Sequence, residues 1–360
     1  MNAFNGKLYE DGFQFCRIDH FDDFEGGKAF FLSHFHRDHM HGISSPAFNQ
    51  IFKEQNNVFF YCSEITKTFI ERDPEIHIPS DKIYILEKNE PVYIIHDNIC
   101  VKVIPLRAGH CPGSLMFLFE SYDGHILYTG DFRLSPKDLE KSQVLLENGH
   151  VVKLNNIYLD TTFADPFYTS FPTREASFNI IKEIIRRSKK LSDISYVAFL
   201  PPASVGIEYL MIELYKTFNK LIHISDYSYH RFHSLIQPLD NLITTDISLT
   251  DMHFCSFKQE DCNPCPLKID KYKVLKIKPS ALYFDDDRLE QNEFYVQEEE
   301  NFFRVAYSSH CSLNELNDFI IYLQPEKITP LVIGNDCTKE MVIDLVLNWK
   351  NNEVDSNLNK

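Results

Sequence analysis

The sequence predicts a mixed α/β protein with a second α/β unit in its later part. Short β-rich runs separated by loops fill residues 1–160, and strand and helix patterns alternate after residue 170. Such alternation is typical of an α/β unit. The chain has 360 residues, of which 44% are hydrophobic and 24% charged. This length and balance suit a globular protein of about two domains.

Strands of the first domain are predicted from runs of β-branched and aromatic residues bounded by turn residues. The expected strands cover residues 29–33, 57–62, 83–86, 92–95, 100–106, 115–119, 125–128 and 157–159. Asp123-Gly124 predicts a hairpin between two of them, because this dipeptide favours a tight turn. A helix is expected to follow Ser63.

The second half is expected to alternate helices and strands. Isoleucines recur on one helical face of residues 173–188, and Thr173 suits the N-cap position. Further helices are expected at 207–218, 314–323 and 339–349, and strands at 197–200 and 331–333. The acidic residues 285–301 are expected to form a solvated loop.

Composition bounds the location and the partners. The sequence has no apolar run of about 18 residues, and its start lacks the basic and apolar segments of a secretory signal. We therefore expect an intracellular protein whose nine cysteines are reduced, some of them as metal ligands. The formal net charge of -16 argues against a polyanionic partner, but bound cations would offset part of it.

The segment His34-Phe35-His36-Arg37-Asp38-His39 predicts a metal site. In extended backbone, His34 and His36 point the same way and can bind one ion together. Asp38 and His39 can serve a second ion close by. Imidazole nitrogen suits zinc, whereas carboxylate oxygen also suits magnesium and manganese. His110 and Asp131 follow two later strands, each beside a glycine that allows close approach of the backbone.

Four segments resemble those of a known family. SHFHRDH, AGHCPGS, YTGDFR and YLDTTF look like the motifs of the Artemis-like nucleases. These enzymes belong to the DNA cross-link repair (β-CASP) branch of the metallo-β-lactamase superfamily. The resemblance implies a four-layer αβ/βα metallo-β-lactamase fold made of residues 1–155 and 322–360. Residues 156–321 would form the inserted α/β β-CASP domain.

The resemblance also implies roles for single residues. His34, His36 and His110 would hold a first metal, and Asp38 and His39 a second, with Asp131 bridging the two. Asp19 would orient a ligand histidine from behind, as metal-bound imidazoles usually require. Asp160 and His310 would pair at the site, where the carboxylate raises the pKa of the imidazole and suits it to donate a proton.

Two further features concern the branch of the family. Residues 331–333 contain no histidine, which resembles the DNA-directed enzymes and predicts a weaker second metal site. A second set, His223, His253, Cys255 and Cys265, looks like a structural zinc site, with Cys262 as an alternative to Cys265. Two histidines and two cysteines give a closed tetrahedral site.

Basic residues near these motifs are candidates for contacts with phosphate groups. They are Arg37, Arg107, Arg133, Lys271, Lys273 and Lys278, together with Ser280. None of them indicates readout of base edges, so recognition through the backbone and the end structure of DNA is expected.

The sequence therefore predicts a metal-dependent endo- or exodeoxyribonuclease acting on hairpins, overhangs and single/double-strand junctions in double-strand-break end processing. Zinc is expected as the active-site metal, with magnesium or manganese as alternatives. The resemblance also implies nuclear location, a monomer, and partnership with a DNA-dependent protein kinase and ligase machinery. The alternatives are a 5′ exonuclease of interstrand cross-link repair, a small-molecule metallohydrolase and a non-enzymatic DNA-end scaffold.

Overall fold

The computed structural model describes residues 4–140, 143–147, 149–200, 205–233, 239–254, 273–290 and 294–358. They belong to two compact units. Unit 1 comprises Met1–Pro166 and Ser309–Lys360, and unit 2 comprises Phe167–Ser308. The boundaries expected from the sequence, at residues 156 and 321, lie inside unit 1. The reason is that strand β11 (Asn156–Leu159) and helix α9 (Leu313–Leu323) pack into the core of this unit.

Unit 1 contains two main sheets. The first is parallel, with the order β1-β2-β3-β4, where β1 is Cys16–Ile18, β2 Ala29–Phe31, β3 Phe59–Cys62 and β4 Ile83–Ile85. The second is mixed, with the order β19-β11-β8-β7-β6-β5. Its strands are β5 (Val92–His96), β6 (Ile99–Arg107), β7 (Leu115–Ser121), β8 (Gly124–Tyr128), β11 (Asn156–Leu159) and β19 (Ile328–Pro330). A small pair, β9 (Leu146–Glu147) and β10 (His150–Val151), is separate.

The side chains of strand β7 alternate between two hydrophobic cores. Phe117 and Phe119 pack with residues of the parallel sheet, such as Phe31, whereas Met116 and Leu118 pack with the helices on the other face. Because successive side chains of a strand point to opposite faces, both faces of this sheet are covered. The continuous apolar run of β7 reflects this burial on both sides.

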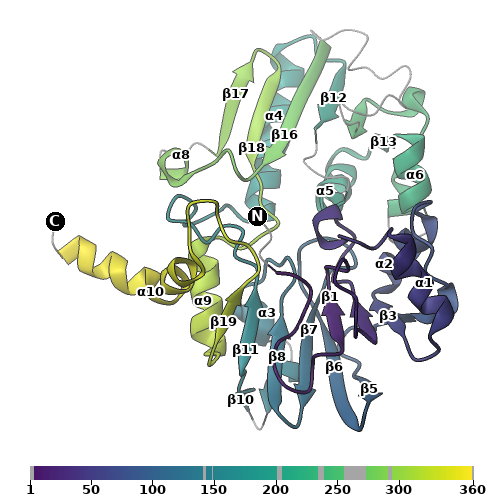
Figure 1. The fold of residues 1–360 in the computed structure, drawn as a ribbon. Coiled ribbons are helices and arrows are strands. Elements are labelled where there is room, and N and C mark those ends of the chain that lie inside the picture. The colour runs from purple at the N-terminus through teal and green to yellow at the C-terminus, as the bar shows by residue number, and fades with distance from the viewer. Residues whose placement is uncertain are drawn as a thin grey trace. The chain divides into compact units, whose positions relative to one another are not determined.

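Helices cover the two outer faces of unit 1. Figure 1 shows α1 (Pro46–Glu54) and α2 (Glu64–Arg72) at one side, beside β3, and α9 (Leu313–Leu323) and α10 (Lys339–Leu358) at the opposite side, next to β19. The other helices of this unit are α3 (Pro136–Glu140) and the 3-10 helices Arg37–His39, Ser80–Lys82 and Gln143–Leu145. The layers are therefore helix, sheet, sheet and helix, which confirms the four-layer fold expected from the resemblance.

Unit 2 is built on one sheet with the order β14-β13-β15-β12-β16-β18-β17. Its strands are β12 (Tyr196–Phe199), β13 (Ile222–Ile224), β14 (Ile243–Thr244), β15 (Met252–Phe254), β16 (Val274–Ser280), β17 (Tyr295–Glu299) and β18 (Phe302–Ala306). Its helices are α4 (Arg174–Leu191), α5 (Glu208–Phe218), α6 (Asp226–Phe232), α8 (Asp286–Glu290) and the 3-10 helices Leu239–Asn241 and Ile247–Leu249. Thr173 caps α4 as expected, accepting a hydrogen bond from the Ala176 N–H.

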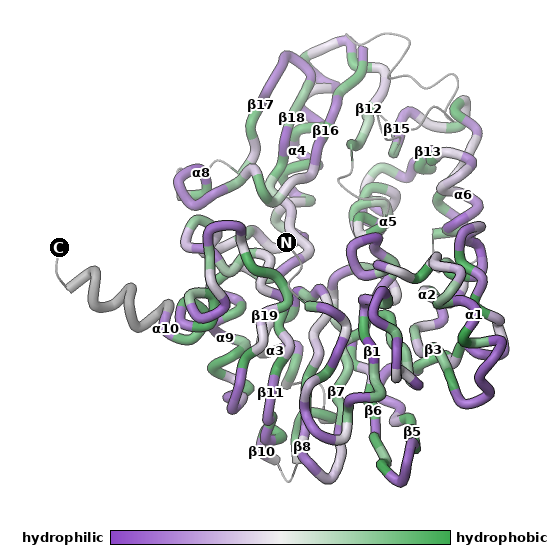
Figure 2. Tube along the Cα trace, in the orientation of Figure 1, coloured by the Kyte–Doolittle hydropathy of each residue, from purple (hydrophilic) through white to green (hydrophobic). Residues whose placement is uncertain are grey.

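Two predictions of local structure were wrong. Residues 285–301 contain α8 and the strand β17 instead of forming only a loop. β17 is a mostly exposed edge strand, where charged residues are common, so its composition hid it. Figure 2 shows α8 in the hydrophilic colour. The strand expected at 331–333 lies at Ile328–Pro330, because Ile328 pairs with Ile157 of β11.

None of the helices in the described ranges combines the length and the apolar character that a membrane span needs.

We expect Phe117→Ala to destabilise unit 1 by about 3–5 kcal/mol, because a fully buried ring between the two sheets would leave a cavity. Chemical denaturation followed by circular dichroism measures this change. Tyr122→Ala, at a ring that is 79% exposed, is the control and should change stability by less than about 0.5 kcal/mol. Equal effects of the two substitutions would contradict the assigned core.

Candidate metal centre

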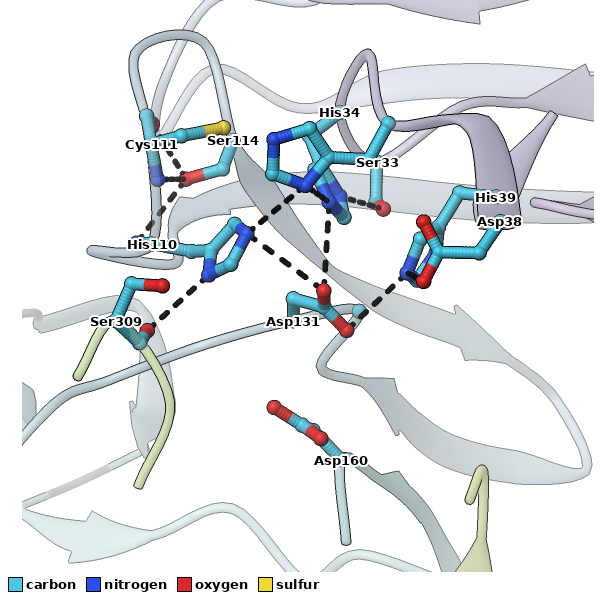
Figure 3. A network of polar contacts seen from close by, with 12 residues as sticks. Ser33, His34, Asp38, His39, His110, Cys111, Ser114, Asp131, Asp160 and Ser309 are labelled. Carbon is cyan, nitrogen blue, oxygen red and sulfur yellow. Dashed lines mark hydrogen bonds and ion pairs between the residues drawn. The ribbon is translucent and has the colours of Figure 1, made fainter. Parts of the chain in front are cut away.

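Four side chains of unit 1 converge from three separate segments. His34 and His36 follow β2, His110 follows β6, and Asp131 follows β8. His34 Nε2 lies 2.9 Å from His36 Nδ1, and His36 Nδ1 lies 3.2 Å from His110 Nε2. Asp131 Oδ2 lies 3.5 Å from His34 Nε2 and 3.6 Å from His110 Nε2. Figure 3 shows His34, His110 and Asp131 facing one another.

The spacing of these atoms fits one tetrahedral ion. Ligands about 2.0–2.1 Å from zinc lie roughly 3.3 Å apart at the corners of a tetrahedron. The four measured separations, 2.9, 3.2, 3.5 and 3.6 Å, bracket this value. The donor set of three imidazoles and one carboxylate is also one that zinc prefers. His34, His36, His110 and Asp131 would therefore hold a first metal ion.

A second cluster shares the carboxylate of Asp131. Its other oxygen, Oδ1, lies 3.2 Å from His39 Nε2, which in turn lies 3.9 Å from Asp38 Oδ2. His39 is buried, whereas the Asp38 side chain is 70% exposed. Asp38, His39 and Asp131 supply three ligand atoms, so this second position has fewer protein ligands than the first.

Asp19 is the buried acceptor behind both clusters. Its carboxylate accepts hydrogen bonds from the Ser33 N–H (2.7 Å), the Ser33 hydroxyl (2.5 Å) and the Tyr128 hydroxyl (2.9 Å). It also lies 2.9 Å from His39 Nδ1, which donates its N–H. Since the Ser33 hydroxyl donates to Asp19, its oxygen accepts from His34 Nδ1 at 2.9 Å. These contacts orient the rings so that Nε2 of His34 and of His39 faces a metal position, where a bound ion would take its lone pair.

Ser33 and Tyr128 received no role from the sequence, although each lies within three residues of an expected ligand. The backbone at Gly130 also contributes to this arrangement, because it passes close to Ser33. Its φ is +49°, and a Cβ atom there would lie 2.7 Å from Ser33 Oγ. This tertiary contact explains the glycine before Asp131.

The loop that presents His110 is fixed by hydrogen bonds. Ser114 Oγ accepts from the backbone N–H groups of His110 and Cys111 and donates to the Cys111 carbonyl. His110 Nδ1 donates to the Ser309 carbonyl at 3.1 Å. A carbonyl oxygen only accepts, so His110 Nε2 holds the lone pair needed for a metal.

His310 and Asp160 form a pair beside these clusters. His310 Nδ1 lies 2.9 Å from Asp160 Oδ2, and His310 Nε2 lies 3.9 Å from Asp131 Oδ2. The Thr162 N–H and hydroxyl bind the other oxygen of Asp160. The structure thus places the second nitrogen of His310 toward the ligand set, while its first nitrogen is oriented by Asp160.

Burial and the neighbouring carboxylates set the protonation of these groups. Burial lowers the pKa of His310, but Asp160 and Asp131 outweigh this effect and raise the pKa to about 9. His310 is therefore protonated at neutral pH. Burial lowers the pKa of His110 well below its ordinary value, with partial opposition from Asp131, so this imidazole is neutral.

The expected structural zinc set lies partly outside the described residues. His223 of β13 and His253 of β15 are neighbours across the sheet, with their Nδ1 atoms 3.1 Å apart and both side chains buried. Burial and the neighbouring His223 lower the pKa of His253 to about 4, so it is neutral. Cys255, Cys262 and Cys265 lie outside the described residues.

The expected DNA-binding residues have different surroundings. Arg37 and Arg107 are exposed in unit 1. In unit 2, Lys273 forms an ion pair with Asp193, and Lys278 and Ser280 lie on β16. Lys271 lies outside the described residues.

Arg133 contacts a carboxylate instead of solvent. Its guanidinium binds Glu315, which caps the start of α9, and its side chain is 9% exposed. Because this guanidinium is buried and already paired with a carboxylate, the structure does not support Arg133 as a contact for phosphate.

Comparisons with known proteins agree with this geometry. Residues 237–336 match the family model described as DNA repair metallo-beta-lactamase. The chain is 32% identical to the protein Artemis of Mus musculus and 31% identical to that of Homo sapiens, over 96% of the chain in both cases. It is 29% identical to the DNA cross-link repair 1A protein of Mus musculus over 94% of the chain.

The chain spans 50% of the length of mouse Artemis and 31% of that of the cross-link repair protein. A crystal structure of a protein of unknown function from Enterococcus faecalis has a similar fold, with a TM-score of 0.52 and 18% identity. That match covers 84% of this chain and 75% of the other.

The fold and the ligand set define a protein with the metallo-β-lactamase fold, a fold whose members use divalent metal ions. Within it, the chain resembles the Artemis-like proteins of the DNA cross-link repair (β-CASP) branch, which confirms the resemblance seen in the four motifs.

We expect His110→Ala to bind about one metal ion fewer per chain, because it removes one of four ligands of the first position. Metal content after dialysis, measured by mass spectrometry, tests this. The control is His77→Ala, an exposed histidine outside the ligand sets. Unchanged metal content in the His110 variant would contradict the assignment.

Proposed function

We propose that this chain is a metal-dependent DNA nuclease that hydrolyses phosphodiester bonds. One observation supports this function more than any other. Eight side chains from five segments of unit 1 form two adjoining metal-ligand sets and an imidazole–carboxylate pair, all of which share Asp131; the other seven are His34, His36, Asp38, His39, His110, Asp160 and His310. Such an arrangement serves hydrolysis at an anionic centre better than it serves binding alone.

A divalent metal, when bound, would supply a Lewis acid that neutralises charge on the scissile phosphate and lowers the pKa of water. His34, His36, His110 and Asp131 would hold the first ion, and Asp38, His39 and Asp131 the second. Zinc fits the first set, and magnesium or manganese are alternatives at the second, where carboxylates contribute more. Asp19 would keep both histidines in the orientation that a ligand needs. It acts on His34 through the Ser33 hydroxyl and on His39 through a direct hydrogen bond.

His310 would donate the proton to the leaving oxygen. Its Nδ1 is held by Asp160, so its Nε2, 3.9 Å from Asp131, carries the proton that faces the ligand set. The carboxylate partner orients the ring and keeps it charged before the reaction. Asp160 therefore acts as a positioning residue for this acid.

The proposed substrates are DNA hairpins, overhangs and single/double-strand junctions during the processing of double-strand breaks. Similarity to Artemis over 96% of the chain supports this choice. Nuclear location and work alongside a DNA-dependent protein kinase and a ligase are further proposals from the same similarity. A 5′ exonuclease of cross-link repair is the second candidate, because the chain is also 29% identical to a DNA cross-link repair 1A protein.

Two supporting sites belong to this proposal. The neutral, facing imidazoles of His223 and His253 favour a structural zinc site completed by Cys255 and by Cys265 or Cys262. Arg37 and Arg107 in unit 1, and Lys271, Lys273, Lys278 and Ser280 in unit 2, are proposed contacts to the DNA backbone.

Two other function classes fit less well. A small-molecule metallohydrolase would not need the long insertion between Asp160 and His310. A non-enzymatic DNA-end scaffold would not need ligand atoms held in this geometry, with buried hydrogen bonds behind them. Both observations favour an enzyme acting on DNA.

We expect Asp38→Ala to reduce DNA cleavage by at least about 100-fold while the fold is retained, because the exposed carboxylate contributes to the second metal position but not to the core. A cleavage assay with added magnesium, manganese or zinc measures the rate. The matched control is Asp81→Ala, since Asp81 is also exposed at the centre of a three-residue 3-10 helix. Full activity of the Asp38 variant would refute the mechanism.

We expect the chain to open hairpin DNA faster than it degrades a 5′-phosphorylated single strand. The similarity to Artemis is greater than that to the cross-link repair protein, in identity and in coverage. Parallel time courses on the two substrates, with Asp38→Ala as the blank, measure the ratio. A reversed ratio would favour the 5′ exonuclease, and cleavage of neither would count against the proposed function.

A further inference from the structure

Another group of metal-ligating side chains lies in unit 1, apart from the ligand sets described above. It consists of His20, Asp22 and His41. The sequence analysis gave these residues no role, and no motif includes all three. His20 and Asp22 follow strand β1, and His41 follows the 3-10 helix Arg37–His39.

The backbone holds these two segments together. His20 and His41 form an isolated parallel bridge, and the Phe21 N–H donates to the His41 carbonyl at 2.7 Å. Gly42 permits the close approach. Its φ is +80°, and a Cβ atom there would lie 2.6 Å from the Asp22 backbone nitrogen and 2.7 Å from Asp22 Oδ1. The positions of His41 and Asp22 beside His20 are therefore fixed by the main chain.

The side chains bring their donor atoms to one place. One ligand atom from each residue lies within 4.8 Å of the other two. His20 Nε2 is 3.8 Å from Asp22 Oδ2, and the two imidazole rings are 5.2 Å apart between centroids. Tetrahedral zinc needs roughly 3.3–3.5 Å between ligand atoms. Asp22 and His41 are exposed, so their side chains can change rotamer without displacing buried residues.

One ring nitrogen of His20 makes no hydrogen bond to the described residues. Its Nδ1 atom is buried and has no hydrogen-bond partner among the described residues. Most buried side-chain polar atoms of folded proteins have such a partner. Since Nδ1 has no hydrogen-bond partner among the described residues and Nε2 faces Asp22 at 3.8 Å, the ring is available as a ligand.

We propose that His20, Asp22 and His41 form a further divalent-metal site, which binds zinc in preference to magnesium. Two imidazoles and one carboxylate are a donor set that suits zinc, whereas magnesium requires oxygen ligands in an octahedral arrangement. Three protein ligands leave the fourth zinc position to solvent.

The site would clamp the segment carrying Asp19 to the segment carrying His39. Asp19 directly precedes His20, and His39 lies two residues before His41. Asp19 Oδ2 and His39 Nδ1 are 2.9 Å apart. An ion held by His20 and His41 would therefore stabilise the contact between Asp19 and His39, and so the orientation of His39 at the second metal position.

Zinc titration of the full chain tests this proposal. The double variant His20→Ala/His41→Ala should bind about one zinc ion fewer per chain than the unsubstituted protein. The matched control His77→Ala/His150→Ala removes two exposed histidines outside the ligand sets and should bind the unchanged number. In the unsubstituted protein, magnesium added at the same concentration as zinc should not displace zinc from this site. A double variant that keeps its full zinc content would overturn the proposal.

A substitution at the exposed carboxylate of Asp22 tests the same site in case the double variant misfolds. Asp22→Asn leaves the backbone and the core unchanged, because its side chain is 63% exposed. Zinc affinity at this position should fall by about tenfold or more, while zinc at the first active-site position stays bound. Equal affinity of Asp22→Asn and the unsubstituted protein would also contradict the site. Neither readout depends on nuclease activity, so failure here is distinguishable from failure of the proposed function.

Discussion

The carboxylate of Asp131 is the group on which the rest of the site depends. Its two oxygens face different sets of histidines, with Oδ2 toward His34 and His110 and Oδ1 toward His39. A buried carboxylate is costly unless it is paired. Here imidazoles and any bound cation compensate its charge. The fold must therefore deliver the donors from separate segments to within a few ångströms of one side chain.

The sandwich of two sheets meets this requirement by ending its strands at one edge. β2, β6, β8 and β11 end next to His34, His110, Asp131 and Asp160, respectively. The core between the sheets fixes these strand ends, because aromatic side chains such as Phe31 and Phe117 pack closely. Asp19 then joins two of the strand ends through Ser33 and Tyr128. Packing and polar contacts thus act together to place the ligands.

Acidity of the chain is compatible with an anionic substrate at such a site. The net charge of -16 opposes a general attraction to DNA. Locally, however, the carboxylates face histidines and metal positions, and Arg37 lies exposed beside the ligands. Recognition of DNA would therefore rest on metal ions and a few basic side chains instead of on the average charge.

The sequence by itself determined the fold class, most strands of unit 1 and the identity of the expected ligands. It did so because apolar runs bounded by turn residues and closely spaced histidines are local patterns. Tertiary structure alone decided what lies far apart along the chain. It paired Arg133 with Glu315, placed Ser309 behind His110, assigned β11 and α9 to unit 1, and joined His20 to His41. These contacts depend on how the strands are ordered in each sheet, and no local pattern encodes that order.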